Sequence, residues 1–213
     1  MNDTQRGESR KLTKAERERK EAYEALEENL GKQGYRKHDL TIGVVQANLY
    51  ASGMAMPVVA VHGGVFYAMH PAGSVSFDFG SIFAVLATFV MLIVVHEAIH
   101  GLVWGAFAKG HRRAVSFGFM VQYLTPYCTC NEPLPKYAYV IGALAPTVLL
   151  GLLPAAVGIA TGSGIWLGVG LLLIVGGGGD LAIVIKLLRF KPKGNDVLYL
   201  DHPYECGIVA FTR

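Results

Sequence analysis

Four long apolar blocks constrain this chain more than any other feature of its sequence. They cover roughly Thr41 to Met69, Ser81 to Ala108, Tyr137 to Ala160 and Ile165 to Leu188. Each block reaches the ~20 residues that an α-helix needs to cross the hydrocarbon core of a bilayer. Because 52% of the 213 residues are hydrophobic, the chain is predicted to be an all-α polytopic membrane protein with about four transmembrane helices.

Lysine and arginine cluster at the ends of these blocks. They are frequent before the first block, in KGHRR at 109–113 and in KLLRFKPK at 186–193, and they are missing from HPAGSVSFDFG and ATGSG. The positive-inside rule therefore predicts a multi-pass, integral protein of the cell membrane, embedded in a lipid bilayer, with both termini in the cytosol. A net charge of +3 is too small to indicate a nucleic-acid partner.

The distribution of charged and apolar residues divides the chain into three parts. Residues 1–39 are strongly charged and predict a cytosolic helix, and residues 40–190 contain the apolar blocks and form the membrane domain. Residues 191–213 follow as a cytosolic tail, in which GIVAF favours one further strand. Asp201 and His202 lie in this tail and are expected to be solvated.

A short stretch between the second and third blocks has the period of a β-strand. Residues 114–122 alternate, with Val115, Phe117, Phe119 and Val121 on one side and Ser116, Gly118, Met120 and Gln122 on the other. A period of two is typical of a strand that covers an apolar surface with one face. We therefore expect a short cytosolic β-hairpin between the second and third transmembrane helices.

The second block contains the motif H-E-x-x-H within MLIVVHEAIHGLVW. On a helix, His96 and His100 lie one turn apart on the same face, so both imidazoles can reach one metal ion. Glu97 then lies beside the metal and can accept a proton from a zinc-bound water, whose pKa the metal lowers to about 7. Titratable groups are costly at this depth of a membrane, and a bound metal would offset much of that cost.

Two histidines leave a catalytic zinc site incomplete, because such sites usually have three protein ligands. Asp180 is the best candidate for the third ligand, since it follows GGGG and is the only acidic residue of the fourth block. His96 lies fifteen residues after Ser81, and Asp180 lies fifteen after Ile165. At ~1.5 Å per residue both side chains are level, ~22 Å from the same side of the membrane. Alternatively, Asp180 caps a helix that restarts at the next residue.

Several segments resemble one known family. HEAIHG in the second block, YCTCNEPL, GALAPTVLLGLLP in the third block and GGGGD in the fourth are similar to the zincin-type peptidases of the DUF3267 family. Members of this family are relatives of the site-2 protease type of intramembrane metalloprotease. The resemblance extends from about Leu40 to the C-terminal end and leaves out the charged helix.

The resemblance implies a helical core like that of site-2 proteases. It also implies a Zn2+ ion held by His96, His100 and Asp180, with Glu97 as the catalytic base. Site-2 proteases usually have glycine after the aspartate, whereas Leu181 stands here. A membrane protein or peptide substrate has to unwind in such enzymes, and we expect the alternating segment at 114–122 to offer a strand edge for it.

Other functions and other sites stay open from the sequence alone. The chain could be a non-catalytic, metal-binding membrane adaptor, or a metal-ion transporter in which the same residues line a pathway. Cys128 and Cys130 are expected to be reduced thiols, with a weak alternative role in a second metal site. Asn48 or Asn131 could donate a hydrogen bond to an oxyanion. The sequence leaves the oligomeric state and the identity of the substrate undetermined.

Overall fold

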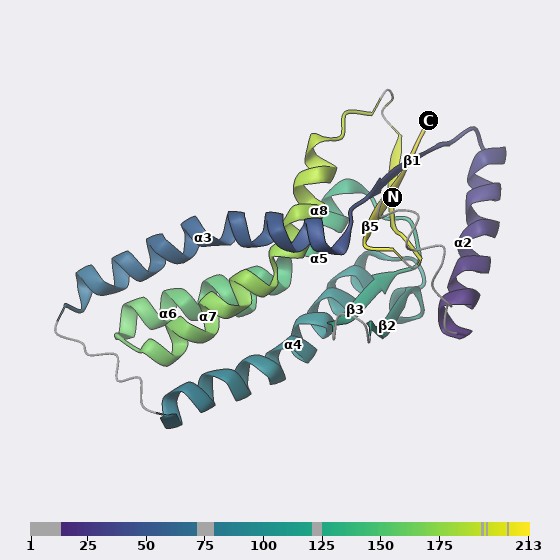
Figure 1. Ribbon diagram of the computed structural model, residues 1–213. Coiled ribbons are helices and arrows are strands. Elements are labelled where there is room, and N and C mark those ends of the chain that lie inside the picture. The colour runs from purple at the N-terminus through teal and green to yellow at the C-terminus, as the bar shows by residue number, and fades with distance from the viewer. Residues whose placement is uncertain (1–13, 72–78, 121–124, 193, 195, 204) are drawn as a thin grey trace.

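The computed structural model describes the whole chain except residues 1–13, 72–78, 121–124, 193, 195 and 204 (Figure 1). Figure 1 shows the long apolar helices side by side, with the strands and one charged helix gathered at one end. The elements in chain order are α2 (Lys14–Lys32), β1 (Arg36–Thr41), α3 (Val44–Met69), α4 (Phe79–Phe107), the 3-10 turn η1 (His111–Ala114), β2 (Val115–Met120), β3 (Thr125–Cys130), α5 (Lys136–Pro146), the π-helical turn η3 (Thr147–Leu152), α6 (Leu153–Thr161), α7 (Gly164–Gly176), α8 (Gly178–Arg189), β4 (Val197–Asp201) and β5 (Gly207–Thr212).

The apolar blocks form helices long and apolar enough to cross a membrane. Three such helices are present in the described part of the chain, at Val45–Met69, Phe79–Phe107 and Lys136–Thr161. α7 and α8 qualify together as a fourth span that is bent by 46° at its break. Large apolar side chains such as Phe83 and Met91 of α4 are exposed, which suits lipid rather than water. This arrangement is consistent with a membrane protein.

The third span changes its hydrogen bonding in the middle. α5 ends at Pro146, which has no backbone N–H to donate to the preceding turn. The chain continues as the π-helical turn η3 and returns to α-helical geometry at Leu153. In the first span, by contrast, α3 continues through Pro57 as one helix. Its residues Ala47, Ala51 and Ala55 are buried, so small side chains let α3 approach its neighbours closely.

The expected all-α fold with one hairpin is confirmed only in part, because the structure contains two antiparallel sheets. The predicted hairpin is present as β2 and β3, which pair from Val115 opposite Cys130 to Met120 opposite Thr125. A three-stranded sheet has the order β1-β5-β4. It combines a strand from before the first span with the two strands of the tail, including the strand expected at GIVAF.

The three-stranded sheet joins the charged helix α2 to the long apolar helices. Successive residues of a strand point to opposite faces, and β5 is buried on both. Val209 and Phe211 face α2 and pack against its Tyr23, in a cluster that also contains Leu30, Leu200 and partly buried Leu26, Tyr35 and Leu198. Ile208 and Ala210 face the other way, into the main core.

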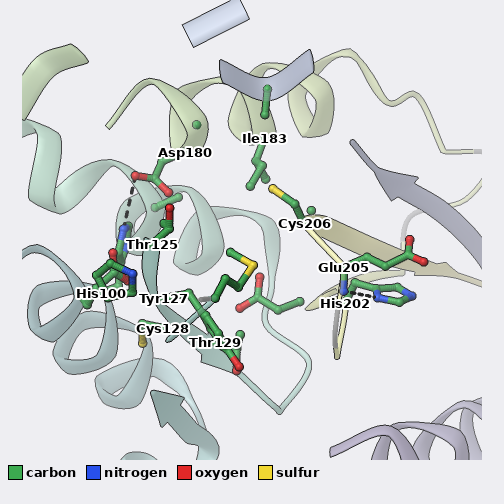
Figure 2. Close-up of a pocket in the computed structure, with 18 of the residues that line it drawn as sticks. His100, Thr125, Tyr127, Cys128, Thr129, Asp180, Ile183, His202, Glu205 and Cys206 are labelled. Carbon is green, nitrogen blue, oxygen red and sulfur yellow. Dashed lines mark hydrogen bonds and ion pairs between the residues drawn. The ribbon is translucent and has the colours of Figure 1, made fainter. Parts of the chain in front are cut away.

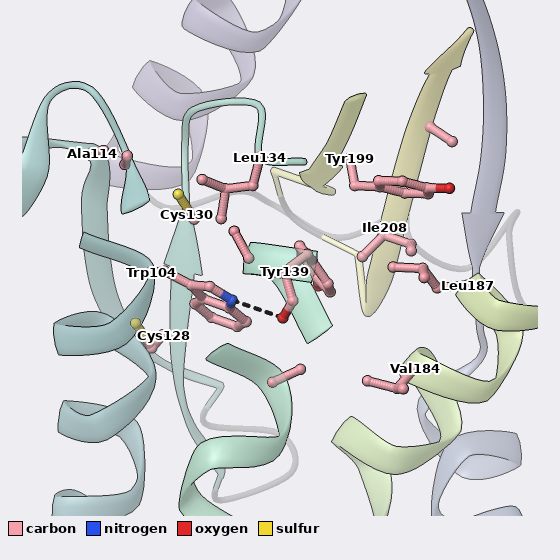
Figure 3. Packing of buried hydrophobic residues seen from close by; sticks show 14 residues of the cluster. Trp104, Ala114, Cys128, Cys130, Leu134, Tyr139, Val184, Leu187, Tyr199 and Ile208 are labelled. Atoms are coloured by element: carbon pink, nitrogen blue, oxygen red, sulfur yellow. Dashed lines mark hydrogen bonds between the residues drawn. The ribbon is translucent and has the colours of Figure 1, made fainter. Parts of the chain in front are cut away.

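The main core lies where α4, α5, α8, the hairpin and the three-stranded sheet meet. Its largest members are Trp104 of α4, Tyr139 of α5 and Tyr199 of β4, and Leu187 of α8 joins Tyr199 on the side of the sheet (Figure 3). The Nε1–H group of Trp104 donates a hydrogen bond to the carbonyl oxygen of Tyr139 at 3.2 Å. The core therefore fixes α4 relative to α5 through a polar as well as an apolar contact.

One glycine allows this close approach. A Cβ atom at Gly142 of α5 would collide with the indole ring of Trp104. We expect Gly142→Ala to lower the free energy of unfolding by about 1–3 kcal/mol, because a buried ring would have to move. The matched control is Gly53→Ala in α3, where an added Cβ meets no described atom within 4 Å. Thermal unfolding in detergent measures both variants, and equal stabilities would contradict the packing role of Gly142.

Candidate metal centre

A cavity of about 240 Å³ lies between α4, β3, α8 and the segment around β4 and β5. His96 and Glu97 line it from α4. Figure 2 shows Cys128 of β3, Asp180 of α8 and Cys206 of the loop before β5 around the same cavity. These residues come from four parts of the sequence that are far apart. The cavity therefore depends on the packing of the fold and not on the H-E-x-x-H helix alone.

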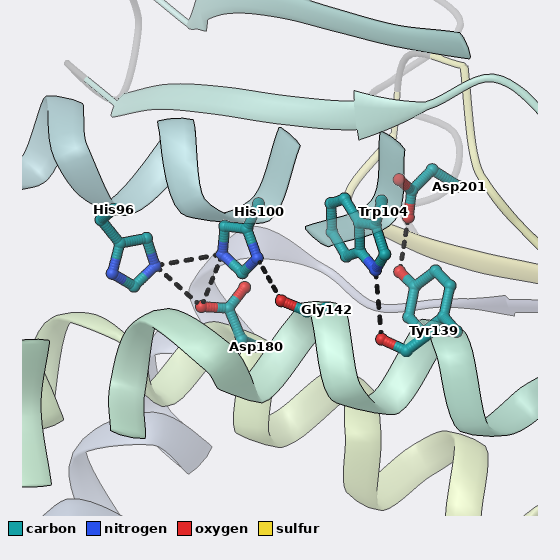
Figure 4. Close-up of polar contacts among 7 residues, drawn as sticks. All are labelled: His96, His100, Trp104, Tyr139, Gly142, Asp180 and Asp201. Carbon is teal, nitrogen blue, oxygen red and sulfur yellow. Dashed lines mark hydrogen bonds and ion pairs between the residues drawn. The ribbon is translucent and has the colours of Figure 1, made fainter. Parts of the chain in front are cut away.

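Two imidazoles and a carboxylate converge at one wall of this cavity (Figure 4). The Nε2 atoms of His96 and His100 are 3.1 Å apart. Oδ2 of Asp180 lies 3.1 Å from Nε2 of His96 and 3.4 Å from Nε2 of His100. Both histidines are buried. The structure thus brings together the three side chains that the sequence selects as metal ligands.

A break in the fourth span brings Asp180 to the histidines. α7 ends at Gly176 and α8 begins at Gly178, so the helix does loosen within the glycine run. An added Cβ would collide with Thr147 at Gly177 and with Ala51 at Gly178, which explains why this break uses glycine. The alternative in which Asp180 caps a helix restarting after it is wrong, because Asp180 already lies in the first turn of α8.

The spacing of the three ligand atoms suits zinc. Bonds of about 2.0–2.1 Å in a tetrahedral site place neighbouring ligand atoms roughly 3.3 Å apart, close to the observed separations. Nδ1 of His100 donates a hydrogen bond to the carbonyl oxygen of Gly142 at 2.9 Å. That bond leaves the lone pair of Nε2 directed at Asp180, the usual support for a metal-binding histidine. The donor set therefore fits a zinc ion with one position left for water.

An aromatic ring holds His100 in this orientation. The indole of Trp104 is stacked on the imidazole, with ring centroids 4.8 Å apart and planes inclined by 16°. Because Trp104 is itself hydrogen-bonded to Tyr139, rotation of the imidazole would disturb the main core. The orientation of His100 is thus set by buried residues outside the motif.

Glu97 lines the same cavity and is half-buried. The backbone N–H of Cys128 is directed toward its carboxylate. Glu97 therefore faces β3, while the neighbouring histidines on α4 face Asp180.

The strand beside the cavity is β3. Thr125 to Thr129 all line the cavity, whereas β2 contributes only Met120. The expectation placed a substrate edge at 114–122; that range holds β2, and its last two residues lie outside the described part of the chain. The free edge that faces the cavity belongs to the other strand of the hairpin.

Asp201 is not solvated, contrary to the expectation. Its Oδ1 accepts a hydrogen bond from the hydroxyl of Tyr139 at 2.5 Å, and its Oδ2 accepts one from the backbone N–H of Cys130 at 2.7 Å. Burial raises the pKa of Asp201 to about 6. This residue was not among the candidates expected from the sequence, although its place at the end of the apolar run VLYL is typical of a strand that enters a core.

His202 is likewise partly buried, and it lines the cavity. Its Nδ1 accepts a hydrogen bond from the backbone N–H of Glu205 at 3.0 Å. Burial lowers the pKa of His202 to about 4, so its imidazole is neutral near pH 7. The tail thus contributes neutral as well as acidic groups to the cavity.

The cysteines and asparagines considered as further site residues differ in their surroundings. All three cysteines are free thiols, and burial raises the pKa of Cys130 to about 12. Within the described residues, the group with metal-ligand spacing is His96, His100 and Asp180, and it includes no cysteine. Asn48 lines the cavity, whereas the side chain of Asn131 donates to the hydroxyl of Ser116 at 2.7 Å.

Comparison with known proteins agrees with the geometry of the site. The model of one family, DUF3267, described as "Putative zincin peptidase", matches residues 89–194. No curated protein and no solved structure matches the chain. The matched segment contains H-E-x-x-H and Asp180 and leaves out α2, β1, α3 and the two strands of the tail. Through this segment the chain belongs to the DUF3267 family, whose name indicates a zinc metallopeptidase.

Proposed function

We propose that this protein is an intramembrane zinc metallopeptidase of the site-2 protease type, which hydrolyses peptide bonds of membrane-embedded substrates. The observation that carries the proposal is the triangle of His96 Nε2, His100 Nε2 and Asp180 Oδ2, with sides of 3.1, 3.1 and 3.4 Å. Glu97 lines the same cavity. The triangle is built on helices that are apolar enough to cross a membrane.

His96, His100 and Asp180 would hold the zinc ion. When bound, zinc supplies a Lewis acid that polarises the scissile carbonyl and makes water more acidic. Glu97 is the general base: its carboxylate takes a proton from the attacking water and delivers it to the leaving amine. Gly142 and Trp104 keep His100 turned toward the ligand group.

The free edge of β3 would bind the substrate as an added strand. A transmembrane helix satisfies its own backbone hydrogen bonds, so a peptide bond becomes accessible only after local unwinding. The unwound segment can then pair with an exposed strand edge. Such pairing would use the outward N–H of Cys128, which is directed toward Glu97. The bound segment would thereby lie beside the carboxylate that acts as base.

The arrangement of charges supports a cytosolic position for the hairpin and both termini. Lys109, Arg112 and Arg113 lie between α4 and β2, and Lys186 and Arg189 lie in the last turn of α8. An excess of lysine and arginine on one side of the spans marks the cytosolic side. The two other functions open from the sequence, a metal-binding adaptor and a metal-ion transporter, are not favoured by any specific contact in the described residues.

Removing one ligand should release the metal. We expect His96→Ala and Asp180→Ala to reduce stoichiometric zinc in the purified protein to a small fraction, since two remaining ligands hold zinc weakly. Inductively coupled plasma mass spectrometry measures the zinc content. The matched controls are His62→Ala and Asp196→Ala, which change the same residue types outside the cavity. Unchanged zinc in Asp180→Ala would show that the third ligand is another residue.

Glu97→Gln should separate metal binding from catalysis. The amide keeps the shape of the side chain but cannot act as a base, so we expect cleavage to fall about 10²–10⁴-fold while the zinc content is unchanged. Cleavage is measured on a probe library of tagged single-span peptides, each with a helix-breaking Asn-Gly pair at a different depth. Glu28→Gln, on the exposed face of α2, is the control. Full activity of Glu97→Gln would rule out its role as base.

A further inference from the structure

The outer edge of β3 offers few backbone donors. Successive N–H groups of a strand point to opposite sides, and Asn131 donates to the carbonyl of Ala114 across the hairpin at 2.7 Å. Pro126, Cys128 and Cys130 therefore direct their backbone groups away from β2. The N–H of Cys130 is held by Asp201 at 2.7 Å, and proline has none. Within β3, only Cys128 is left with an outward N–H that an added strand can use, beside Glu97.

A strand edge with several equivalent donors does not fix the register of its partner. If the added strand shifts by one residue, each of its side chains turns to the opposite face. If it shifts by two residues, its side chains keep their faces, and the pleat opposes the shift only weakly. A peptidase that binds by strand addition therefore needs a further element to decide which peptide bond faces the metal. The hydrogen bond from Cys130 to Asp201 occupies the N–H group with which a strand shifted by two residues would pair.

We propose that Asp201 is a positioning residue that fixes the register of the substrate: its carboxylate occupies the N–H of Cys130, so an added strand pairs at Cys128. This inference rests on the proposed peptidase function. It assigns to the tail, which lies outside the matched segment 89–194, a role in choosing the scissile bond. Asp201 would act through β3 and would not touch the reacting atoms.

Asp201 is itself fixed relative to the metal ligands. The hydroxyl of Tyr139 donates to its second carboxylate oxygen at 2.5 Å. The backbone carbonyl of Tyr139 accepts from Trp104, whose ring is stacked on His100. The buried residue Tyr139 thus contacts both Asp201, at the edge of β3, and Trp104, which orients His100 (Figure 4). The distance between Asp201 and the metal centre is therefore set by the packing of the main core.

The backbone of β4 is also anchored next to β3. Tyr199 and Leu134 exchange two backbone hydrogen bonds, at 2.8 and 2.9 Å. Leu134 follows the end of β3 by four residues, so β4 is attached to the segment that leaves the hairpin. This bridge places Asp201, two residues after Tyr199, at the end of β3.

The test is the position of the cleaved bond in the probe library. Product masses identify that bond for the full-length protein and each variant. We expect the wild-type protein to cut each probe at one bond, and Asp201→Ala to cut an additional bond two residues away. Asp201→Asn should keep the wild-type bond, because its amide oxygen can still accept from Cys130. Asp196→Ala, which removes a carboxylate that binds Tyr35 and Arg213 outside the cavity, should also keep it.

The outcomes separate this inference from the proposed function. If the wild-type protein cuts no probe, or Glu97→Gln cuts as well as wild type, the proposed function falls and the inference with it. If wild type cuts and Asp201→Ala cuts only the same bond, at whatever rate, Asp201 is merely structural and the inference alone is overturned. A shifted bond in Asp196→Ala or Asp201→Asn overturns it too. If Asp201→Ala does not fold, Asp201→Ser replaces it, with the same shift expected, and the wild-type bond alone overturns the inference.

Discussion

The carboxylate of Asp180 among two buried imidazoles is the contact on which the rest of the structure depends. An ionisable side chain in an apolar helix is costly unless it has partners, and Asp180 finds them in His96 and His100, at 3.1 and 3.4 Å. The break between α7 and α8 and the glycines within it let α8 approach α3 and η3 closely enough to reach that position. The glycines are thus needed together with Asp180, because they allow the close packing that brings its carboxylate to the histidines.

A second set of contacts connects this centre to the three-stranded sheet. His100 stacks on Trp104, Trp104 donates to Tyr139, and Tyr139 donates to Asp201. These groups come from α4, α5 and β4, and each is at least partly buried and has a defined partner. Polar networks that are satisfied in this way specify one arrangement of a core. The three-stranded sheet, through Asp201, therefore helps to fix the geometry of the cavity.

Much of this fold could be predicted from local patterns. Apolar length gives the spans, a period of two gives the hairpin, and the spacing of His96 and His100 with the depth of Asp180 gives the ligand group. β1 could not be found in this way, because RKHDLT has no apolar alternation and becomes a strand only by pairing with β5. Asp201 is a different case: the apolar run VLYL before it indicates a strand, but its partners, Tyr139 and Cys130, are far away in sequence, so no local pattern predicts its hydrogen bonds.

The central position of β5 affects how the protein is made. β1 precedes the first span and pairs with β5, which follows the fourth. During synthesis from the N-terminus, β1 leaves the ribosome long before its partner exists, and the chain between them contains all the described helices that are long and apolar enough to cross a membrane. β4, which carries Asp201, is also held by β5. The wall of the cavity formed by the tail can therefore close only after all these helices have been synthesised, so an incomplete chain would lack the finished cavity.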